Sequence, residues 1–484
     1  MNAPARHLET QNLQTLIAHG YRHHHCRYII LTVRQAATAR RFLQALVTEG
    51  WIEPANGRAV GRPAHPTPVS VGLTYPGLCT LGLNERHLGV LQERARAFYE
   101  GPHRRAASRL ADTGGSAPAY WDPRFHRTAA HVLLAVHGAS PAALDLAQRE
   151  LQELAQGAFD DAGWADPVVA NHLKTVPGPG GADRFTVHFG FVDGVSKVGI
   201  KGLKERRSDV GAKVHEPGEF FLGYPNDEGY NPWSLSAELP PPHPAPDEVP
   251  LADFFRNASF AALRDMRQDE KAFRSYTSKK AQELGVSPEY VQAKMLGRWP
   301  GGAVVRPEEQ EPPVHTPAPS TIDAFDFSDD AKGLGCPFGS HIRRMNPRTD
   351  PVVPFRRRPL IRRGMPYGPA YVEGGEGVED EKSPPARGLL GLFLCASLED
   401  QFEHLVSEWG DASPMGTRNK GNGKDPIIGN HVNARALLDI PMAGESLRQL
   451  DGMTPFITTR GTLYLFFPGL NALALMDNKN VFGP

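Results

Sequence analysis

The feature that most constrains the fold is the alternation of strand-like and helix-like segments along the first half of the chain. Residues 27–33 (RYIILTV) form an apolar, β-branched run, and residues 36–50 then repeat their apolar side chains at helical spacing. Residues 131–137 (HVLLAVH) are a second such run, and Ser140 after it is a typical helix N-cap. Strand–helix–strand units of this kind are typical of a ferredoxin-like α+β domain.

The remaining patterned segments extend this arrangement over the rest of the chain. Strands are predicted at 69–73, 184–189, 255–266 and 387–397, helices at 83–99, 268–284, 287–296 and 398–409, and a hairpin at 455–467 that turns at Arg460 and Gly461. We therefore expect an α+β fold of two ferredoxin-like domains with antiparallel sheets and peripheral helices. The expected domains are residues 1–190 and residues 191–484.

Charge and cysteine spacing disfavour several classes of function. Lysine and arginine total 53 against 54 acidic residues, so the basic excess of a general nucleic-acid or membrane-surface binder is missing. The four cysteines are widely scattered, without the spacing of a zinc or iron–sulfur site. No segment is long and apolar enough to span a bilayer, and the first residues lack the pattern of a secretory signal. The expected location is the cytoplasm.

One short segment presents a carboxylate in a tight turn. Asp193 lies in the sequence GFVDG, between Gly190 and Gly194 and just after a predicted strand. Two flanking glycines permit a turn that directs one side chain into a cavity. An ordinary turn between two elements has the same composition, so this segment alone is a weak signal.

Two further segments contribute a histidine and several arginines. His341 lies in GCPFGSHIRRMNPR, beside Arg343 and Arg344, and Arg362 begins the segment RRGMPYGP. A neutral imidazole is a common protein ligand of haem iron, and arginine side chains can hold haem propionates. A surface histidine and an exposed arginine pair are the ordinary alternatives.

Taken together and in this order, the three segments resemble the signature of the dye-decolorizing peroxidase family. The match includes the GxxDG turn, the CPFxxHIRRxNPR block and the RxGxPYGP block. Residues 218–229, 293–302, 389–403 and 461–470 are also similar to segments of that family. The resemblance therefore covers essentially the whole chain.

The resemblance implies a haem peroxidase, with haem b held in the C-terminal domain. It implies that His341 is the proximal iron ligand, that Asp193 is the distal acid that moves the peroxide proton, and that Arg362 is the distal cation. The implied reaction reduces hydrogen peroxide through an oxidised haem (compound I), which then takes single electrons from dyes, phenols or similar small aromatic donors. Mn(II) is a further donor to consider, and dimers in the family make a homodimer one expectation.

The same resemblance suggests secondary roles. Glu403 occupies the family's QFE position and is predicted to accept the second N–H of the proximal imidazole, with a solvated helix-surface glutamate as the alternative. Phe393 resembles a haem-facing distal phenylalanine, whereas Gly391, two positions earlier, leaves the shape of the distal wall open. Arg343 and Arg344 are candidates for contacts with the haem propionates or edge.

The sequence leaves two functions open, a haem peroxidase and a haem-binding protein. A protein of this fold could bind haem in order to extract its iron, as a deferrochelatase does, with weak peroxidase activity. Binding alone needs only His341 and a pocket, so the presence of both Asp193 and Arg362 favours the enzyme.

Trp233, Trp299 and Trp409 are candidates for relays to bulky donors, although tryptophan usually serves in packing.

Overall fold

A long antiparallel sheet runs through the centre of the molecule. The structure, a computed structural model, describes residues 7–57, 64–173, 175–177, 183–204, 213–234, 251–313, 322–348, 358–371, 386–412, 423–432, 436–442 and 446–483. Within these residues, nine strands form the sheet in the order β10-β12-β9-β15-β2-β3-β1-β4, and β11 pairs with β12 beside β10. All of these pairings are antiparallel.

The sheet joins strands from the two halves of the chain. One group comprises β1 (His25–Leu31), β2 (Val69–Leu73), β3 (Val132–Gly138) and β4 (Val168–Asn171). The other comprises β9 (Ser259–Gln268), β10 (Ile361–Arg362), β11 (Met365–Tyr367), β12 (Gly388–Cys395) and β15 (Ile457–Phe467). The groups meet where Phe466 of β15 pairs with Leu73 of β2.

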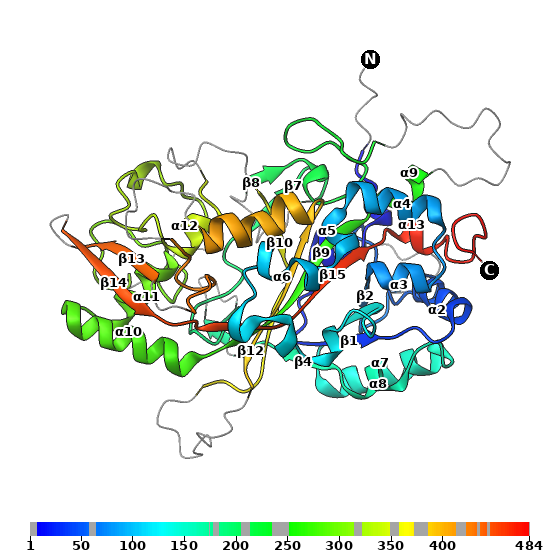
Figure 1. Cartoon of the computed structure of the whole chain (residues 1–484), viewed down its shortest axis with the longest axis horizontal. Helices are drawn as coiled ribbons and strands as arrows, with labels where there is room; N and C mark the ends of the chain where they lie inside the picture. The colour runs from blue at the N-terminus through cyan, green and yellow to red at the C-terminus, as the bar shows by residue number, and fades with distance from the viewer. Residues whose placement is uncertain are drawn as a thin grey trace.

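Helices and a smaller hairpin surround the sheet at its two ends. In Figure 1, α2 (Ala36–Thr48), α7 (Pro141–Ala155) and α8 (Asp161–Ala165) lie to the right of the long central strands. To the left lie α10 (Glu270–Leu284), α11 (Pro288–Leu296), α12 (His341–Met345) and the hairpin of β13 (Ala436–Pro441) and β14 (Leu447–Met453).

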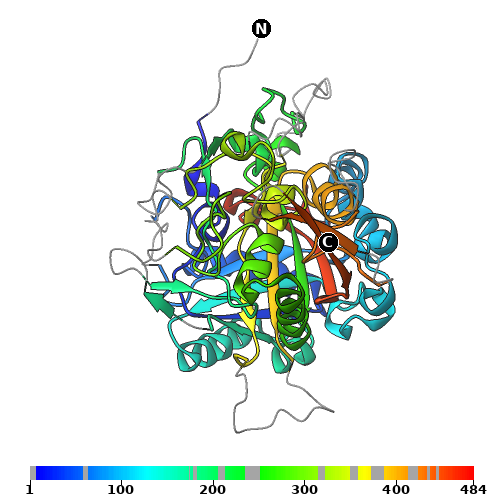
Figure 2. The same cartoon turned by 90° about the vertical axis from the view of Figure 1, so that its left-hand side faces the viewer.

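One side of the sheet is covered by α4 (Glu85–Arg94), α5 (Arg96–Glu100), α6 (Pro102–Arg109) and two π-helical segments, η10 (Leu398–Glu403) and η11 (Leu405–Asp411). The π-helical segments are orange and the other three helices blue to cyan in Figure 2, where they gather on the same side of the strands. Helix α5 contacts η10, and α6 contacts η11.

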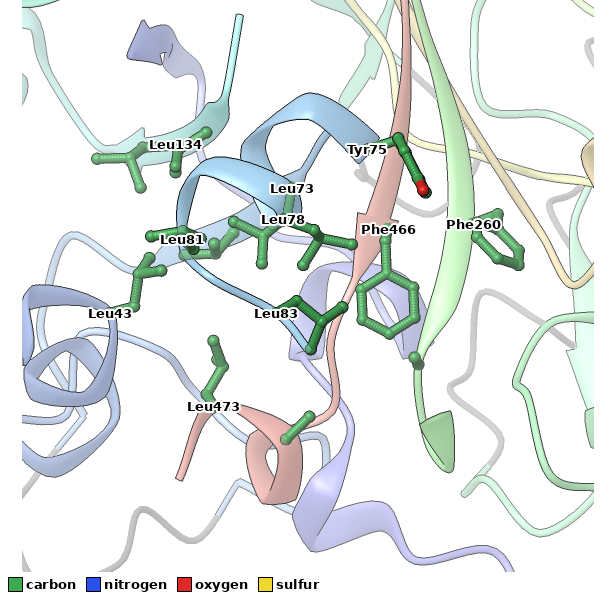
Figure 3. Packing of buried hydrophobic residues seen from close by; sticks show 14 of the residues in the cluster. Leu43, Leu73, Tyr75, Leu78, Leu81, Leu83, Leu134, Phe260, Phe466 and Leu473 are labelled. Atoms are coloured by element: carbon green, nitrogen blue, oxygen red, sulfur yellow. The ribbon is translucent and has the colours of Figure 1, made fainter. Parts of the chain in front are cut away.

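The central strands are apolar on both faces, because both faces are covered. On β3, Val132 and Leu134 pack into one core cluster while Leu133 and Ala135 pack into the other. Figure 3 shows part of the first cluster, in which Phe466 lies near leucines from the segment that follows β2. Because both faces of these strands are buried, their sequences are continuous apolar runs.

Several predicted elements are confirmed, and their helix caps explain where they begin. The side chains of Asn84, Ser140 and Ser287 each accept the backbone N–H three residues later, at the starts of α4, α7 and α11. Such caps satisfy backbone donors that have no partner within the helix. The predicted helix at 83–99 is nevertheless two helices, because Ala95 leaves the helical conformation.

Two strand predictions are wrong. The expected hairpin at 455–467 is a single strand, β15, with an irregularity between Thr459 and Gly461 where a turn was predicted. A Cβ at Gly461 would lie 2.2 Å from the Phe125 ring, so this glycine permits a close approach rather than a reversal. The predicted strand at 184–189 is only the short β6 (Asp183–Phe185), paired with β5 (Thr175–Pro177).

The fold is thus α+β with antiparallel strands, as expected. The edge of the main sheet is instead formed by β4, at 168–171, where no strand was predicted. The proline-rich residues 239–250 lie outside the described residues. No helix in the described part of the chain has the length and apolarity needed to cross a membrane. The domain boundary at residue 190 and the cytoplasmic location stay predictions.

Candidate active site

His341 begins helix α12 and is held from behind by a buried carboxylate. The preceding Ser340 donates its hydroxyl to the backbone carbonyl of Lys294, which fixes the start of this short helix against α11. The His341 Nδ1 lies 2.9 Å from Oδ2 of Asp425, and the other oxygen of Asp425 accepts the backbone N–H groups of Ile427 and Ile428. The imidazole ring is therefore fixed through its Nδ1 atom.

Asp425 keeps its charge although it is fully buried. Burial alone would raise the pKa of this carboxyl group, but the adjoining His341 imidazole and the Arg344 guanidinium hold the pKa below its ordinary value. A negative charge behind the ring favours a proton on Nδ1 and leaves Nε2 with its lone pair. The His341 side chain remains 22% exposed, as a ligand to an external group requires.

Asp193 and Arg362 come together across 169 positions of sequence. The Asp193 backbone N–H donates to the carbonyl of Phe185, and the flanking Gly190 and Gly194 adopt φ values of +85° and +67°. These left-handed conformations favour glycine and create the turn. Arg362 Nη2 donates to Asp193 Oδ1 at 3.0 Å, and the two side chains are 52% and 26% exposed.

The position of Arg362 follows from strand register. Arg362 on β10 lies directly opposite Phe393 on β12, so both side chains project from the same face of the sheet. The Phe393 ring lies over Gly391, where an added Cβ would meet the ring at 2.6 Å. The missing side chain at Gly391 therefore leaves room that the Phe393 ring occupies.

The helix that begins at His341 and the segment that leads into β10 pack against the same small cluster. Met345, at the end of α12, and Leu360, two residues before Arg362, pack against one small cluster built on Leu405 and Trp409 of η11. Leu360 and Phe393 also pack against the larger core beneath. The helix that carries the histidine and the strand that carries the arginine are thus anchored to a shared support.

The prediction for Glu403 is wrong. Its two carboxylate oxygens accept from Nε and Nη2 of Arg105, each at 2.6 Å, and one of them also accepts the hydroxyl of Tyr464 at 2.8 Å. The side chain is buried, but it belongs to an ion pair with α6 rather than to the imidazole. Asp425, which no family motif singled out, takes the role predicted for Glu403.

The proposed haem contacts of Arg343 and Arg344 are also contradicted. Arg343 donates to the carbonyls of Asp330 and Cys336 and lies between the rings of Phe327 and Phe338. Arg344 donates to the carbonyl of Trp409. Both arginines are at most 1% exposed, so neither guanidinium presents surface to an external group. Both side chains hold neighbouring backbone segments of the protein together.

His172 is a neighbour of the distal pair that sequence analysis missed. Its ring stacks on that of Phe185, with centroids 3.7 Å apart, next to the carbonyl that holds the Asp193 backbone. Burial lowers the pKa of His172 to about 4, partly opposed by the charge of Asp193. A neutral imidazole therefore borders the acid over most of the pH range.

Known proteins of similar sequence are dye-decolorizing peroxidases. No family model matches the chain. A dye-decolorizing peroxidase of the fungus Mycetinis scorodonius is 25% identical over 433 residues, which cover 84% of this chain and 76% of the relative. A multifunctional dye peroxidase of an Amycolatopsis species is 26% identical over 457 residues, which cover 91% of this chain and 90% of the relative.

The chain is thus a relative of fungal and bacterial dye-decolorizing peroxidases over most of its length. Solved structures agree with the fold. A dye-decolorizing peroxidase in complex with 2,6-dimethoxyphenol superposes with a TM-score of 0.75 at 22% identity, covering 96% of this chain and 98% of the other. A fungal member from Auricularia auricula-judae superposes with a TM-score of 0.75 at 19% identity, covering 97% of this chain and 99% of the other.

The reassignment of Glu403 can be tested by stability. Glu403→Gln should lower the free energy of unfolding by about 1–3 kcal/mol, because the partly buried Arg105 guanidinium loses its charged bidentate partner and keeps only Glu100. The exposed Glu408→Gln on the next turn should change it by no more than about 0.5 kcal/mol. Urea unfolding of both variants measures the difference, and equal stabilities would contradict the assignment of Glu403 to this ion pair.

Proposed function

We propose that the protein is a haem peroxidase that reduces hydrogen peroxide and oxidises small aromatic or dye-like donors. The observation that carries this proposal is the partly exposed Asp193–Arg362 pair, an acid and a cation held 3.0 Å apart on the sheet face that also bears Phe393. Binding of haem alone needs no such pair. The similarity to dye-decolorizing peroxidases supports peroxidase chemistry at the level of that family.

The residues present fit haem b. His341 would hold the iron through Nε2, because its Nδ1 atom is engaged by Asp425 and its ring keeps exposed surface. Phe393, partly exposed beside Arg362, would border the group on the sheet side. When bound, haem supplies an iron centre that takes oxidising equivalents from peroxide and passes them on singly to donors.

Asp425 would strengthen His341 as a ligand of the iron. Its buried charge accepts the Nδ1 proton of His341, which makes Nε2 more basic and therefore a stronger electron donor. Because two backbone N–H groups also hold Asp425, the ring cannot turn without breaking several hydrogen bonds. The proximal ligand is thus fixed in both tautomer and orientation.

Asp193 and Arg362 act on peroxide. Peroxide must lose a proton from one oxygen and regain it on the other before its O–O bond can break. With Oδ1 held by Arg362, the second carboxylate oxygen of Asp193 can take that proton and return it. The Arg362 guanidinium stabilises the negative charge that develops on the departing hydroxide.

Phenols and dyes are the donors best supported. One relative of known structure was determined in complex with 2,6-dimethoxyphenol, and others carry the name of dye peroxidases. Mn(II) has no such support, because in the described ranges no group of three or more His, Cys, Asp or Glu side chains is arranged to hold a metal ion. Haem binding for iron extraction is the second candidate, and the peroxide reaction distinguishes it.

Replacement of the proximal ligand tests the function directly. His341→Ala should lose most haem and nearly all peroxidase activity, because the iron loses its protein ligand. Haem content by absorbance and turnover with 2,6-dimethoxyphenol are the measurements, with the exposed His126→Ala as the matched control. A His341→Ala protein with full haem content and an unchanged Soret band would overturn the assignment.

Replacement of the distal cation tests the peroxide step. Arg362→Leu should retain haem but slow the peroxide-induced change of the Soret band by a factor of about 10² to 10³, because one preorganised charge is worth about 3–4 kcal/mol. Stopped-flow mixing with peroxide measures this rate, with the exposed Arg34→Leu as control. A rate within a few-fold of wild type would leave Arg362 without this role.

The pH profile tests the acid. If Asp193 moves the proton, the peroxide rate of the wild type should fall in acid as this carboxylate takes up a proton of its own. Asp193→Asn keeps the shape and can still accept the Arg362 hydrogen bond, but it cannot take a proton, so its rate should be low and this acid limb should vanish. Wild-type rate and pH dependence in Asp193→Asn would show that Arg362 activates peroxide without the acid.

A further inference from the structure

Arg363, the residue after Arg362, joins β10 to a distant part of the chain. Its guanidinium donates from Nε to the backbone carbonyl of Leu16 at 2.8 Å and from Nη2 to that of Ile17 at 3.1 Å. Both carbonyls belong to the short helix α1 (Thr15–Ala18), 347 and 346 residues earlier in the sequence. Carbonyl groups in the last turn of a helix have no partner within it, so they accept donors of this kind.

The two neighbouring arginines point to opposite faces of the sheet. Side chains alternate along a strand, so Arg363 shares a face with Ile361. That face packs against α1, because Ile361 lies in one core cluster with Leu16 and Ile17. Arg362 projects from the other face, which bears the candidate active site. Any effect of Arg363 on that site must therefore pass through the backbone of β10.

Helix α1 is a firm support for this contact. All four of its residues are buried, and so is Gln14 just before it. The Gln14 side chain donates to the carbonyls of Val71 and Pro468 and accepts the backbone N–H of Val71. These bonds tie the start of α1 to β2 and to the residue after β15, at the place where the two halves of the sheet meet. The helix therefore cannot move without breaking buried hydrogen bonds.

Strand β10 depends on such an anchor more than the central strands do. It has two residues, lies at the end of the sheet order and, within the described ranges, pairs with β12 alone. The backbone of an edge strand is paired on one side only. Arg362 on this strand is 52% exposed, so water surrounds about half of its long side chain. The position of its guanidinium is therefore set by the position of the strand.

We propose that Arg363 is a positioning residue for the peroxide step, because by joining β10 to α1 it holds the Arg362 guanidinium against Asp193. The inference rests on the proposed peroxidase function. A displacement of about 1 Å in a positioned group can slow a reaction by about a hundredfold. The next strand, β11, also pairs with β12 and still restrains the chain after Arg363, so the loss of this one contact costs less than that.

Gly20 allows the same contact to be disturbed from the side of α1. Gly20 adopts a φ of +69°, and an added Cβ would lie 3.0 Å from Nε of Arg363. Gly20→Ala therefore strains its own turn and crowds the guanidinium, while β10 keeps its sequence. If both substitutions act through this contact, Arg363→Ala combined with Gly20→Ala should react with peroxide no more slowly than Arg363→Ala alone.

The test measures the peroxide-induced change of the Soret band by stopped flow in the haem-loaded full-length protein. Arg363→Ala should retain haem and slow this change by about tenfold. Arg363→Lys keeps a cation that can donate to the carbonyls of α1, so its rate should recover to within about threefold of wild type. Oxidation of 2,6-dimethoxyphenol by protein already treated with peroxide should stay within about twofold in both variants.

The matched control changes a different contact of the same N-terminal segment. Glu9 accepts hydrogen bonds from the side chains of Asn12 and Asn257, far from β10 in the sequence. Glu9→Gln removes its charge and should lower the stability of the protein without changing the peroxide rate. This control separates a positioning role from a general loss of stability.

Hydrogen exchange of the same proteins provides a readout that does not depend on turnover. The backbone N–H of Arg363 donates to the carbonyl of Leu392, so the amides of residues 361–365 should exchange about tenfold faster in Arg363→Ala and at the wild-type rate in Glu9→Gln. A peroxide rate within about twofold of wild type in Arg363→Ala, or an equal slowing in Glu9→Gln, would overturn the positioning role. A wild type whose Soret band does not respond to peroxide would instead overturn the proposed function.

Discussion

The register of β10, β12, β9 and β15 decides which side chains share a face with Arg362. Because side chains alternate along a strand, a shift of one residue in any of these pairings would turn its side chains to the opposite face. The register brings Phe393 and Tyr464 into one row with the arginine, while Leu392 and Leu263 of the adjacent row point into the other core cluster. Both cores must therefore be packed for the site to exist.

Asp425 and Glu403 are two buried carboxylates, and each contacts a side chain that can give it a proton. Asp425 is balanced by His341 and backbone N–H groups, and Glu403 by Arg105 and the hydroxyl of Tyr464. A buried charge is tolerated only where partners of this kind surround it. The same requirement makes each carboxylate a proton acceptor for one specific neighbour, an imidazole in one case and a phenol in the other.

Local chemistry made much of this structure predictable from sequence. Helix caps at Ser140 and Ser287 and the glycines beside Asp193 depend on nearby residues, and the structure has them as expected. The contact between Asp193 and Arg362 joins distant segments, yet both lie in family motifs. The fold class followed from the strand and helix patterns, whereas the domain boundary stays a prediction.

The wrong and missed predictions share one cause, because a local sequence pattern does not specify which distant residue a side chain will contact. Nothing near Glu403 indicates that Arg105, 298 residues earlier, will occupy its carboxylate. Asp425 had one local signal, the two backbone donors at Ile427 and Ile428, but such Asx turns are common. The bulge in β15 resembles a turn because Gly461 serves to admit the Phe125 ring.

The central claim is that His341 would hold the haem iron and that Asp193 and Arg362 would act on peroxide. A crystal structure of the haem-loaded protein measures this most directly. The account predicts His341 Nε2 as the protein ligand of the iron, with Nδ1 still on Asp425 and with Asp193 and Arg362 lining the haem pocket. Ligation by another side chain, or an Asp193–Arg362 pair outside the haem pocket, would contradict it.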